Sequence, residues 1–272
     1  MPSAVVFGPG VMGFYSLSGA CDALYDRGVA QHIDRVSGSS AGSIAAFLFA
    51  AMSLKPSIKN VIFEDLTEYT KFNIVDLTTS WGGIVHWKKF LTLVMKKMGF
   101  NPSMTMKEFY NMTKIDLHIS AFNLHRARTI YFSHLTHPDL SIVDAMAASS
   151  AVPFVFAPVT IDGELYVDAA ALEKYPLSPF LGMRPEDVLI VALGDNLIRP
   201  SDEGITNFVE FSHRVFTTFS SSLLNTETYD NFPNKVIIDT DINLGNLSMT
   251  RDEKIALYVL GFEQICSKFE KN

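Results

Sequence analysis

Two short apolar runs near the N-terminus each end at a glycine-rich turn that opens a helix-like pattern. Residues 4–7 read Ala-Val-Val-Phe and stop at the glycines of the segment Gly8–Gly13, after which residues 14–27 show helical spacing. A second short strand then leads into Gly38–Gly42, and another helical pattern continues to about Met52. Strands that alternate with helices in this way build layered α/β folds with a largely parallel sheet.

The rest of the chain continues this alternation, without repeats, low-complexity tracts or a linker. Residues 56–110 look mostly helical. We therefore expect one domain over residues 1–272, with its core motifs within about 4–180. Further strands are expected near 115–121, 129–132, 155–159, 165–167, 189–193 and 236–238, and further helices near 142–148 and 251–269.

Composition and charge exclude several classes of protein. Of the 272 residues, 48% are hydrophobic and 19% are charged, so a large buried core can form. The formal charge of −7 argues against nucleic acid as a partner. The most apolar stretch, Ile44–Leu54, has 11 residues, whereas a membrane-spanning helix needs roughly 20. Residues 1–7 do not resemble a secretory signal and the two cysteines make no disulfide framework, so we expect a cytoplasmic protein.

The turn Gly38-Ser39-Ser40-Ala41-Gly42 fits the pattern Gly-x-Ser-x-Gly. A serine on such a strained bend exposes its hydroxyl, and glycines on either side avoid clashes with the neighbouring elements. The preceding Arg35-Val36 ends a strand and the following Ile44–Leu48 is strongly helical, which is the required context. The pattern predicts Ser40 as a nucleophile supported by Gly38 and Gly42. A strand–turn–helix packing junction is the alternative.

The segment Gly8–Gly13, which reads Gly-Pro-Gly-Val-Met-Gly, fits two functions. It matches Gly-x-Gly-x-x-Gly, the dinucleotide-binding fingerprint of oxidoreductases, and Asp34 follows at about the expected 20 residues. However, that acid belongs at the end of the second strand, and Asp34 precedes this strand. Beside Gly38–Gly42 the loop amides would suit an oxyanion hole better. The residues assigned to this oxyanion hole are Gly8, Pro9, Gly10 and Val11, with Gly13 in support.

A serine hydroxyl needs a base that takes its proton. None of the seven histidines stands in a pattern that marks such a base. His213 lies in a polar, helix-like run, while His125, His134 and His137 lie in or near a loop without metal-ligand spacing.

Asp168 is the better candidate base. It ends the apolar strand Leu165-Tyr166-Val167 and is followed by three alanines. A carboxylate beside such small side chains can approach a neighbouring turn and accept the Ser40 proton directly. The alternative is a strand-end carboxylate that only caps the next turn.

Together these segments resemble the patatin-like phospholipase family. The resemblance covers nearly the whole chain in the right order, and its joint spacing is quite specific. Besides the two glycine turns it includes Ala147–Pro153 leading into Phe156–Pro158, then Asp162-Gly163, Tyr166–Asp168 and Tyr175–Leu177.

The resemblance implies a three-layer α/β/α sandwich with a largely parallel central sheet. It also implies a Ser–Asp dyad, in which Ser40 is the nucleophile and Asp168 the base, with an oxyanion hole at the Gly8 loop. The implied substrates are phospholipids or acylglycerols, hydrolysed through an acyl-enzyme without a metal or cofactor. Many members have glycine at the positions of Pro9 and Ala169, so a lipid-binding relative impaired in turnover is the non-enzymatic alternative.

Residues Trp87–Met98 have an amphipathic arrangement at helical spacing. Aromatic and aliphatic side chains share one face, and four lysines share the other. This arrangement is typical of helices that lie in a membrane interface, so we expect peripheral contact with membranes or lipid droplets here. A core-packed helix with solvated lysines is the alternative.

Overall fold

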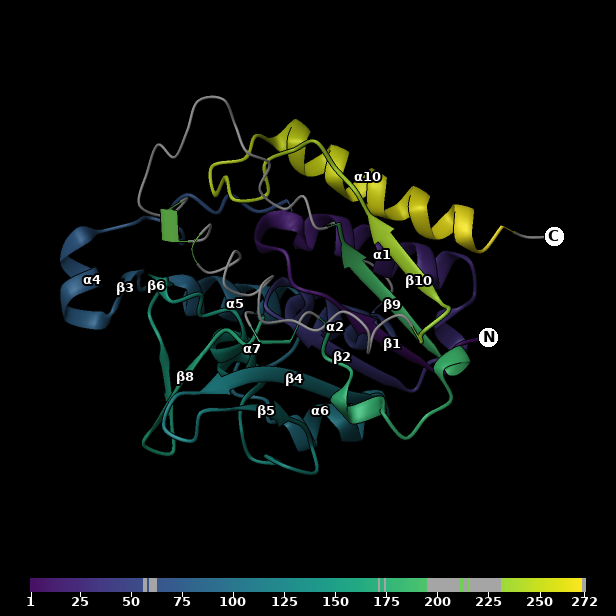
Figure 1. Cartoon of the computed structure of the whole chain (residues 1–272), viewed down its shortest axis with the longest axis horizontal. Helices are drawn as coiled ribbons and strands as arrows, with labels where there is room; N and C mark the ends of the chain where they lie inside the picture. The colour runs from purple at the N-terminus through teal and green to yellow at the C-terminus, as the bar shows by residue number, and fades with distance from the viewer. Residues whose placement is uncertain are drawn as a thin grey trace.

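The computed structural model describes residues 1–55, 58, 63–170, 172–173, 175–194, 211–212, 215 and 231–270. These residues form a mixed α/β fold in which a central, mostly parallel sheet is flanked by helices (Figure 1). The strands of this sheet are β1 (Ala4–Phe7), β2 (Arg35–Ser39), β4 (Asp116–Asn123), β5 (Arg128–Phe132), β7 (Val159–Ile161), β8 (Glu164–Val167), β9 (Val188–Leu193) and β10 (Lys235–Ile238). The α-helices are α1 (Phe14–Asp26), α2 (Ala41–Met52), α4 (Ile74–Ser80), α5 (Trp87–Lys97), α6 (Met106–Thr113), α7 (Ile142–Ser149) and α10 (Arg251–Lys268).

The strand order of the main sheet is β10-β9-β1-β2-β4-β8-β7, and β5 pairs with β4 outside this path. Strands β10, β9, β1, β2 and β4 are parallel, whereas β8, β7 and β5 join as antiparallel partners. The chain first builds from β1 toward β4 and later adds β9 and β10 on the other side of β1. In open α/β folds, ligands bind where the strand order reverses in this way, beyond the carboxyl ends of the strands. At these ends β1 and β2 carry the two glycine turns.

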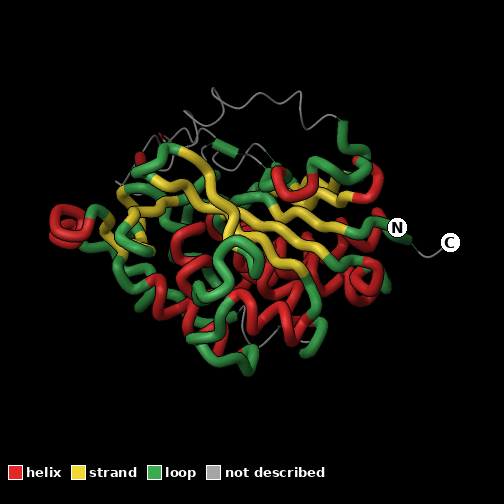
Figure 2. Tube along the Cα trace, turned by 90° about the horizontal axis from the view of Figure 1, so that it is seen from below, coloured by secondary structure: helices red, strands yellow, loops and turns green. Residues whose placement is uncertain are grey.

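Strand β1 is apolar throughout because both of its faces are buried. Val5 and Phe7 pack into the core formed with the helices, whereas Ala4 and Val6 pack into a smaller cluster on the other face. Figure 2 shows most of the helices gathered on one side of the sheet. The other face is covered by residues 175–183, which include the short 3-10 helix η3 (Ser178–Phe180).

Most of the predicted elements are confirmed, with differences of a few residues at their ends. The second strand does not end at Val36 but continues to Ser39, because its small residues stay in register with β4 up to Ser120. The predicted strand at 155–159 is divided into β6 (Phe154–Phe156) and β7, since Pro158 has no N–H for a ladder bond.

The region expected to be mostly helical contains a strand, β3 (Gly82–Ile84), between α4 and α5. It pairs in parallel with β6 to form a separate two-stranded sheet. None of the helices among the described residues is both long and apolar enough to cross a membrane.

Candidate active site

Ser40 stands between the last residue of β2 and the first residue of α2. Its backbone angles are φ 55° and ψ −125°, a conformation that residues other than glycine rarely adopt. The bend is held by Ser43, whose amide and hydroxyl donate to the Ser40 carbonyl oxygen at 2.9 and 2.7 Å. The Ser40 amide donates to the Ser149 hydroxyl at 3.0 Å. The serine therefore lies on a strained bend of the kind that the sequence predicts.

The two glycines of this turn are required for steric reasons. A Cβ at Gly38 would overlap the backbone of Gly42, and a Cβ at Gly42 would overlap the carbonyl oxygen of Phe7 and lie 2.5 Å from that of Gly8. No side chain fits at either position without a backbone shift. The close approach of Gly42 to Gly8 also shows that the two glycine turns lie side by side, as predicted.

Some amides of the first glycine turn donate to backbone carbonyl oxygens, and others are free to bind a ligand. Those of Gly8 and Gly13 donate to backbone carbonyl oxygens at 2.9 and 2.7 Å, and Pro9 has no N–H. Within the described part of the chain, the amides of Gly10 and Val11 have no acceptor. Val11 has a φ of 46°, which is rare for a β-branched residue. The loop thus offers its free donors at Gly10 and Val11.

Strand register brings Ser40 and Asp168 to the same place, on the two sides of β4. Ser40 follows β2, which runs parallel to β4, and Asp168 follows β8, which runs antiparallel to it. Both residues come level with Ala121 of β4, so their backbones are separated by two strand spacings, roughly 10 Å. A small residue stands between them. The last register pairs that place them so are Ser39 with Ser120 and Phe122 with Val167.

The Asp168 side chain is buried, with 2% of the residue exposed. Its Oδ1 accepts the Ala170 amide at 2.8 Å. Burial raises the pKa of Asp168 to about 7, and hydrogen bonding from the Ser40 hydroxyl and the Ala170 amide acts in the opposite direction. The contact with Ser40 is looser than a regular hydrogen bond, because Oδ2 has no partner of normal geometry among the described residues. Catalytic hydrogen bonds are often long without substrate and tighten when it binds.

Ala169, where the resemblance leads one to expect glycine, is fully buried and is not among the residues with positive φ. Its backbone therefore needs no left-handed conformation. An alanine at this position does not strain the Asp168 carboxylate.

The segment 147–153 connects the two halves of the site. Ser149 accepts the Ser40 amide, and the carbonyl oxygen of Ala151 accepts the Asp168 amide at 3.0 Å. Between them, the Ser150 hydroxyl accepts the indole N–H of Trp87 at 2.8 Å. In the sequence this segment stands out only as part of a family pattern. Its positioning role depends on contacts between residues that are 17, 63 and 109 positions apart in the chain, for which the sequence carries no local signal.

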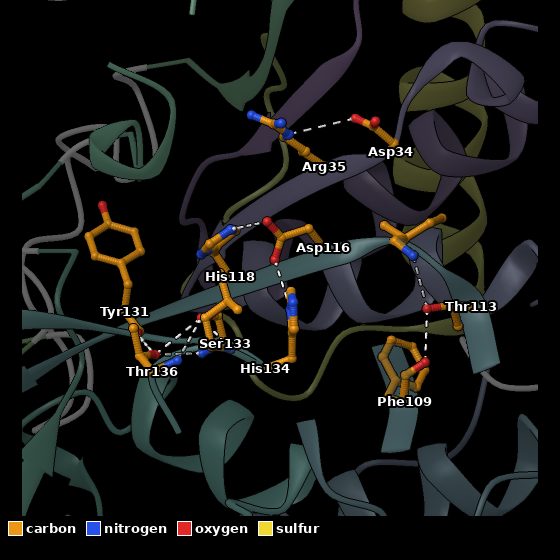
Figure 3. Close-up of polar contacts among 12 residues, drawn as sticks. Asp34, Arg35, Phe109, Thr113, Asp116, His118, Tyr131, Ser133, His134 and Thr136 are labelled. Atoms are coloured by element: carbon orange, nitrogen blue, oxygen red, sulfur yellow. Dashed lines mark hydrogen bonds and ion pairs between the residues drawn. The ribbon is translucent and has the colours of Figure 1, made fainter. Parts of the chain in front are cut away.

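His118 and His134 lie on either side of Asp116, the first residue of β4 (Figure 3). His118 Nε2 is 3.0 Å from Asp116 Oδ2, and His134 Nδ1 is 3.1 Å from Asp116 Oδ1. The Tyr110 ring stacks on His134 with ring centroids 3.7 Å apart. Asp116 begins β4 level with Arg35 of β2, five residues before Ser40, and His118 is level with Ser37, three residues before it. Roughly 10 to 16 Å of strand therefore separates this cluster from Ser40. These histidines therefore cannot act as its base.

Three other features also bear on the sequence predictions. Asp34, the acid that a dinucleotide site would need, is an exposed residue directly before β2 and thus far from the glycine loop. His213 lies outside the described residues. No group of three or more metal-ligating side chains in the described part of the chain is arranged to hold a metal ion.

Helix α5, predicted to contact membranes, has its apolar face packed into the core. Of its lysines, Lys88 pairs with Asp144 and Lys97 with Glu64, and Lys89 is exposed. Only the basic face is left to meet a membrane, and membrane contact by this helix stays a prediction. The buried apolar residues are Trp87, Phe90, Leu91, Val94 and Met95, followed by Met98.

A family model described as patatin-like phospholipase matches residues 5–181, which is more than half of the chain. The chain belongs to the patatin-like phospholipase family. The matched region begins in β1 and includes both glycine turns, Ser40 and Asp168. The family predicted from the sequence is thereby confirmed.

Known relatives of this patatin-like chain include viral and bacterial proteins. A protein of Invertebrate iridescent virus 6 named "Probable lipid hydrolase 463L" is 27% identical over 150 residues, which cover 52% of this chain and 50% of the viral protein. An uncharacterized NTE family protein of Mycobacterium bovis is 26% identical over 219 residues, which cover 80% of this chain and 56% of the relative. The alignments thus span only about half of the length of these curated relatives.

Among solved structures, VipD from Legionella pneumophila has a similar fold. The superposition has a TM-score of 0.57 at 17% sequence identity and covers 99% of this chain and 67% of VipD. This likeness supports the predicted fold class, an α/β fold with a mostly parallel sheet flanked by helices.

Proposed function

We propose that this patatin-like protein hydrolyses the carboxylic esters of lipids, with phospholipids or acylglycerols as substrates. One observation carries the proposal: Ser40 on its strained bend faces the buried carboxylate of Asp168 across a single alanine of β4. A base with a pKa of about 7 is close to the optimum for proton transfer at neutral pH. The proposal therefore assigns a Ser–Asp dyad without a histidine.

In the proposed reaction, Ser40 Oγ attacks the ester carbonyl carbon while Asp168 takes the hydroxyl proton. The resulting tetrahedral intermediate collapses to an acyl-serine, and the protonated Asp168 gives its proton to the departing alcohol. Water then attacks the acyl-serine, again losing its proton to Asp168. The fatty acid leaves, and Ser40 regains its proton.

The negative charge on the former carbonyl oxygen needs N–H donors that are already in place. The amides of Gly10 and Val11 are free within the described residues and lie on the loop beside Ser40. Ala41, the first residue of α2, adds an amide at a helix N-terminus, where no intrahelical acceptor exists. This set refines the predicted oxyanion hole toward Gly10 and Val11.

The test is fluorophosphonate labelling of the wild type, Ser40→Ala and Asp168→Asn, paired with fatty-acid release from phospholipid and acylglycerol vesicles. We expect labelling of the wild type and none of Ser40→Ala, with release lost in both variants. Labelling that survives in Ser40→Ala would rule out this nucleophile. His213→Ala serves as the control for a triad, because it should retain turnover if the dyad is complete.

Two alternatives are distinguished when binding of dinucleotides and of vesicles is measured beside labelling and fatty-acid release. A dinucleotide-dependent oxidoreductase would show saturable binding of NAD or NADP and no labelling of Ser40. A lipid-binding relative without turnover would bind vesicles and release no fatty acid. The free loop amides and the unstrained Ala169 favour the active enzyme over this second alternative.

The substrates proposed here reside in membranes and lipid droplets, so peripheral contact with a lipid surface is part of the proposal. Helix α5 provides exposed lysines for that contact, but its apolar face is buried. The apolar part of a membrane contact must therefore come from another element.

A further inference from the structure

Five large apolar side chains are exposed on neighbouring elements at one end of the molecule, where α4 projects (Figures 1 and 2). Helix α4 has no buried residue, and it packs beside β3, the partner of β6. The five residues are between 36% and 62% exposed. We call them the α4–β6 surface, and they are Ile74, Val75, Trp81, Val85 and Phe154.

Two aromatic residues of this surface stand in backbone conformations that do not favour them. Trp81 has a φ of 58° and Phe154 a φ of 68°, in the left-handed region where glycine or asparagine is preferred. They are close together, because Phe154 is the register partner of Gly82, which directly follows Trp81. Each combines backbone strain with an aromatic ring that the chain itself leaves in water. An apolar phase outside the protein would give both rings a favourable environment.

The α4–β6 surface is joined directly to the candidate active site. Strand β6 begins three residues after Ala151, whose carbonyl oxygen holds the amide of Asp168. On the other strand of the pair, the carbonyl oxygen of Ile84 accepts the Ala157 amide at 3.1 Å. Trp87, the first residue of α5, donates to the Ser150 hydroxyl. A partner bound to the α4–β6 surface would therefore have a fixed position relative to the candidate active site.

The segment that carries four of the five residues has a small excess of basic residues, in contrast with the chain as a whole. Residues 71–89 contain three lysines and one aspartate, whereas the full chain has a formal charge of −7. Lys71 and Lys89 are exposed, and Lys88 pairs with Asp144. Exposed aromatic rings on elements whose chain segment also carries exposed lysines match the interface of an anionic membrane, where rings enter the acyl boundary and ammonium groups meet lipid headgroups.

We propose that the α4–β6 surface inserts into an anionic lipid surface and thereby places the Ser40 site against the phase that holds its substrate. This inference rests on the proposed function for the identity of the phase. It assigns the apolar half of the membrane contact to α4, β6 and the two residues that flank β3, and the basic half to Lys71 and the start of α5.

The test is vesicle flotation of the full chain with Ser40→Ala, which cannot turn over lipid, on phosphatidylcholine vesicles with and without phosphatidylserine. The variant to compare adds Trp81→Asn and Phe154→Asn. Asparagine accepts left-handed φ, so this variant is expected to fold with an unchanged or higher unfolding temperature. The matched control is Leu135→Asn, a residue that is 74% exposed and follows His134 at the opposite edge of the sheet.

We expect phosphatidylserine to strengthen binding, and the double asparagine variant to lower the partition coefficient about tenfold or more. Leu135→Asn should leave binding unchanged. With Ser40 restored, the double variant should hydrolyse a soluble short-chain ester like the wild type and lose activity on vesicles.

Unchanged vesicle binding in the double variant would overturn the inference. Loss of a self-associated form in the same variant, with vesicle binding retained, would also overturn it and assign the surface to a second copy of the chain. Because flotation uses the Ser40→Ala background, its outcome does not depend on turnover. Failure of Ser40 labelling would instead count against the proposed function alone.

Discussion

Asp168 combines two properties that oppose each other. Its carboxyl group is buried beside Ser40, which suits a base, but burying a charge destabilises the fold. The pKa in the folded protein is about 7, whereas an aspartate in an unfolded chain titrates near 3.9. Between these values the folded state holds a proton that the unfolded state has lost. The free energy of unfolding therefore falls as pH rises through this window.

Asp168→Asn should remove this destabilisation together with the base. Above pH 7 we expect the variant to be more stable than the wild type by up to about 4 kcal/mol, the equivalent of three pKa units. The difference should vanish below about pH 3, where the aspartate is protonated in both states. Urea unfolding at both pH values measures it. A variant that is less stable above pH 7 would show that the carboxylate is not penalised by burial.

The pH dependence of ester hydrolysis follows from the same group. Asp168 must be ionised to take the Ser40 proton, so kcat/KM for a soluble ester should rise about tenfold per pH unit below pH 7 and then level off. The inflection should lie near 7. A rate that stays flat from about pH 5 to 8 would contradict Asp168 as the base with this pKa.

At the scale of elements, the site depends on the contact between two strand–turn–helix units. The unit β1–α1 contributes the loop with free amides, and the unit β2–α2 contributes Ser40 on its bend. Strain at Val11 and Ser40 persists because backbone packing around Gly42 leaves no room for relaxation. The loop and the bend should therefore respond together to a change at their contact.

Gly42→Ala tests this contact, because the new Cβ would overlap backbone atoms at the end of β1. The loop amides must then shift, and we expect kcat to fall about 100-fold or more, with a stability loss of about 1–3 kcal/mol. Gly182→Ala is the matched control, since a Cβ there meets nothing within 4 Å. Steady-state kinetics and thermal unfolding measure both. Equal kinetics for the two variants would show that loop placement does not limit turnover.

At the scale of the whole molecule, the two edges of the sheet carry different polar groups. The carboxyl ends of β1 and β2 carry the candidate site, whereas Asp116 with His118 and His134 stands at the other edge. Burial raises the pKa of Asp116, but the hydrogen bond with His118 and the electrostatic interaction with His118, His134 and Arg35 outweigh it, so the pKa lies below its ordinary value. We interpret this cluster as structural.

The domain organisation also belongs to this scale. That residues 1–272 form a single domain stays a prediction.

Asp116→Asn should then lower stability without changing the chemistry. We expect a loss of about 1–3 kcal/mol, because both imidazoles lose a charged partner, and an unchanged kcat for a soluble ester in the folded protein. Asp34→Asn, an exposed residue at the same edge, is the control and should change stability by less than about 0.5 kcal/mol. A large loss of kcat in folded Asp116→Asn would show that the two edges are coupled.

Much of the fold and of the candidate site could be predicted from local patterns. The glycines around Ser40 and the apolar run of β1 carry strong signals, because turn geometry and two-sided burial restrict which residues are allowed. The contact of Ser149 with Ser40 had no such signal, since it joins residues distant in the chain. The pairing of Asp116 with His118 and His134 had none either, because it depends on how side chains of β4 and of the loop after β5 are oriented.

The sequence by itself determined the alternation of strands and helices, the family, and the two residues proposed for catalysis. Only the tertiary structure decided which apolar faces are covered. The pattern of residues 87–98 predicts an amphipathic helix, but its apolar face is buried by packing, while Trp81 and Phe154 remain in water. A side chain's exposure depends on which distant elements pack over it, and periodicity reports only the face on which it lies. The structure likewise showed that Ser40 and Asp168 come level at Ala121, because strand register sets that distance.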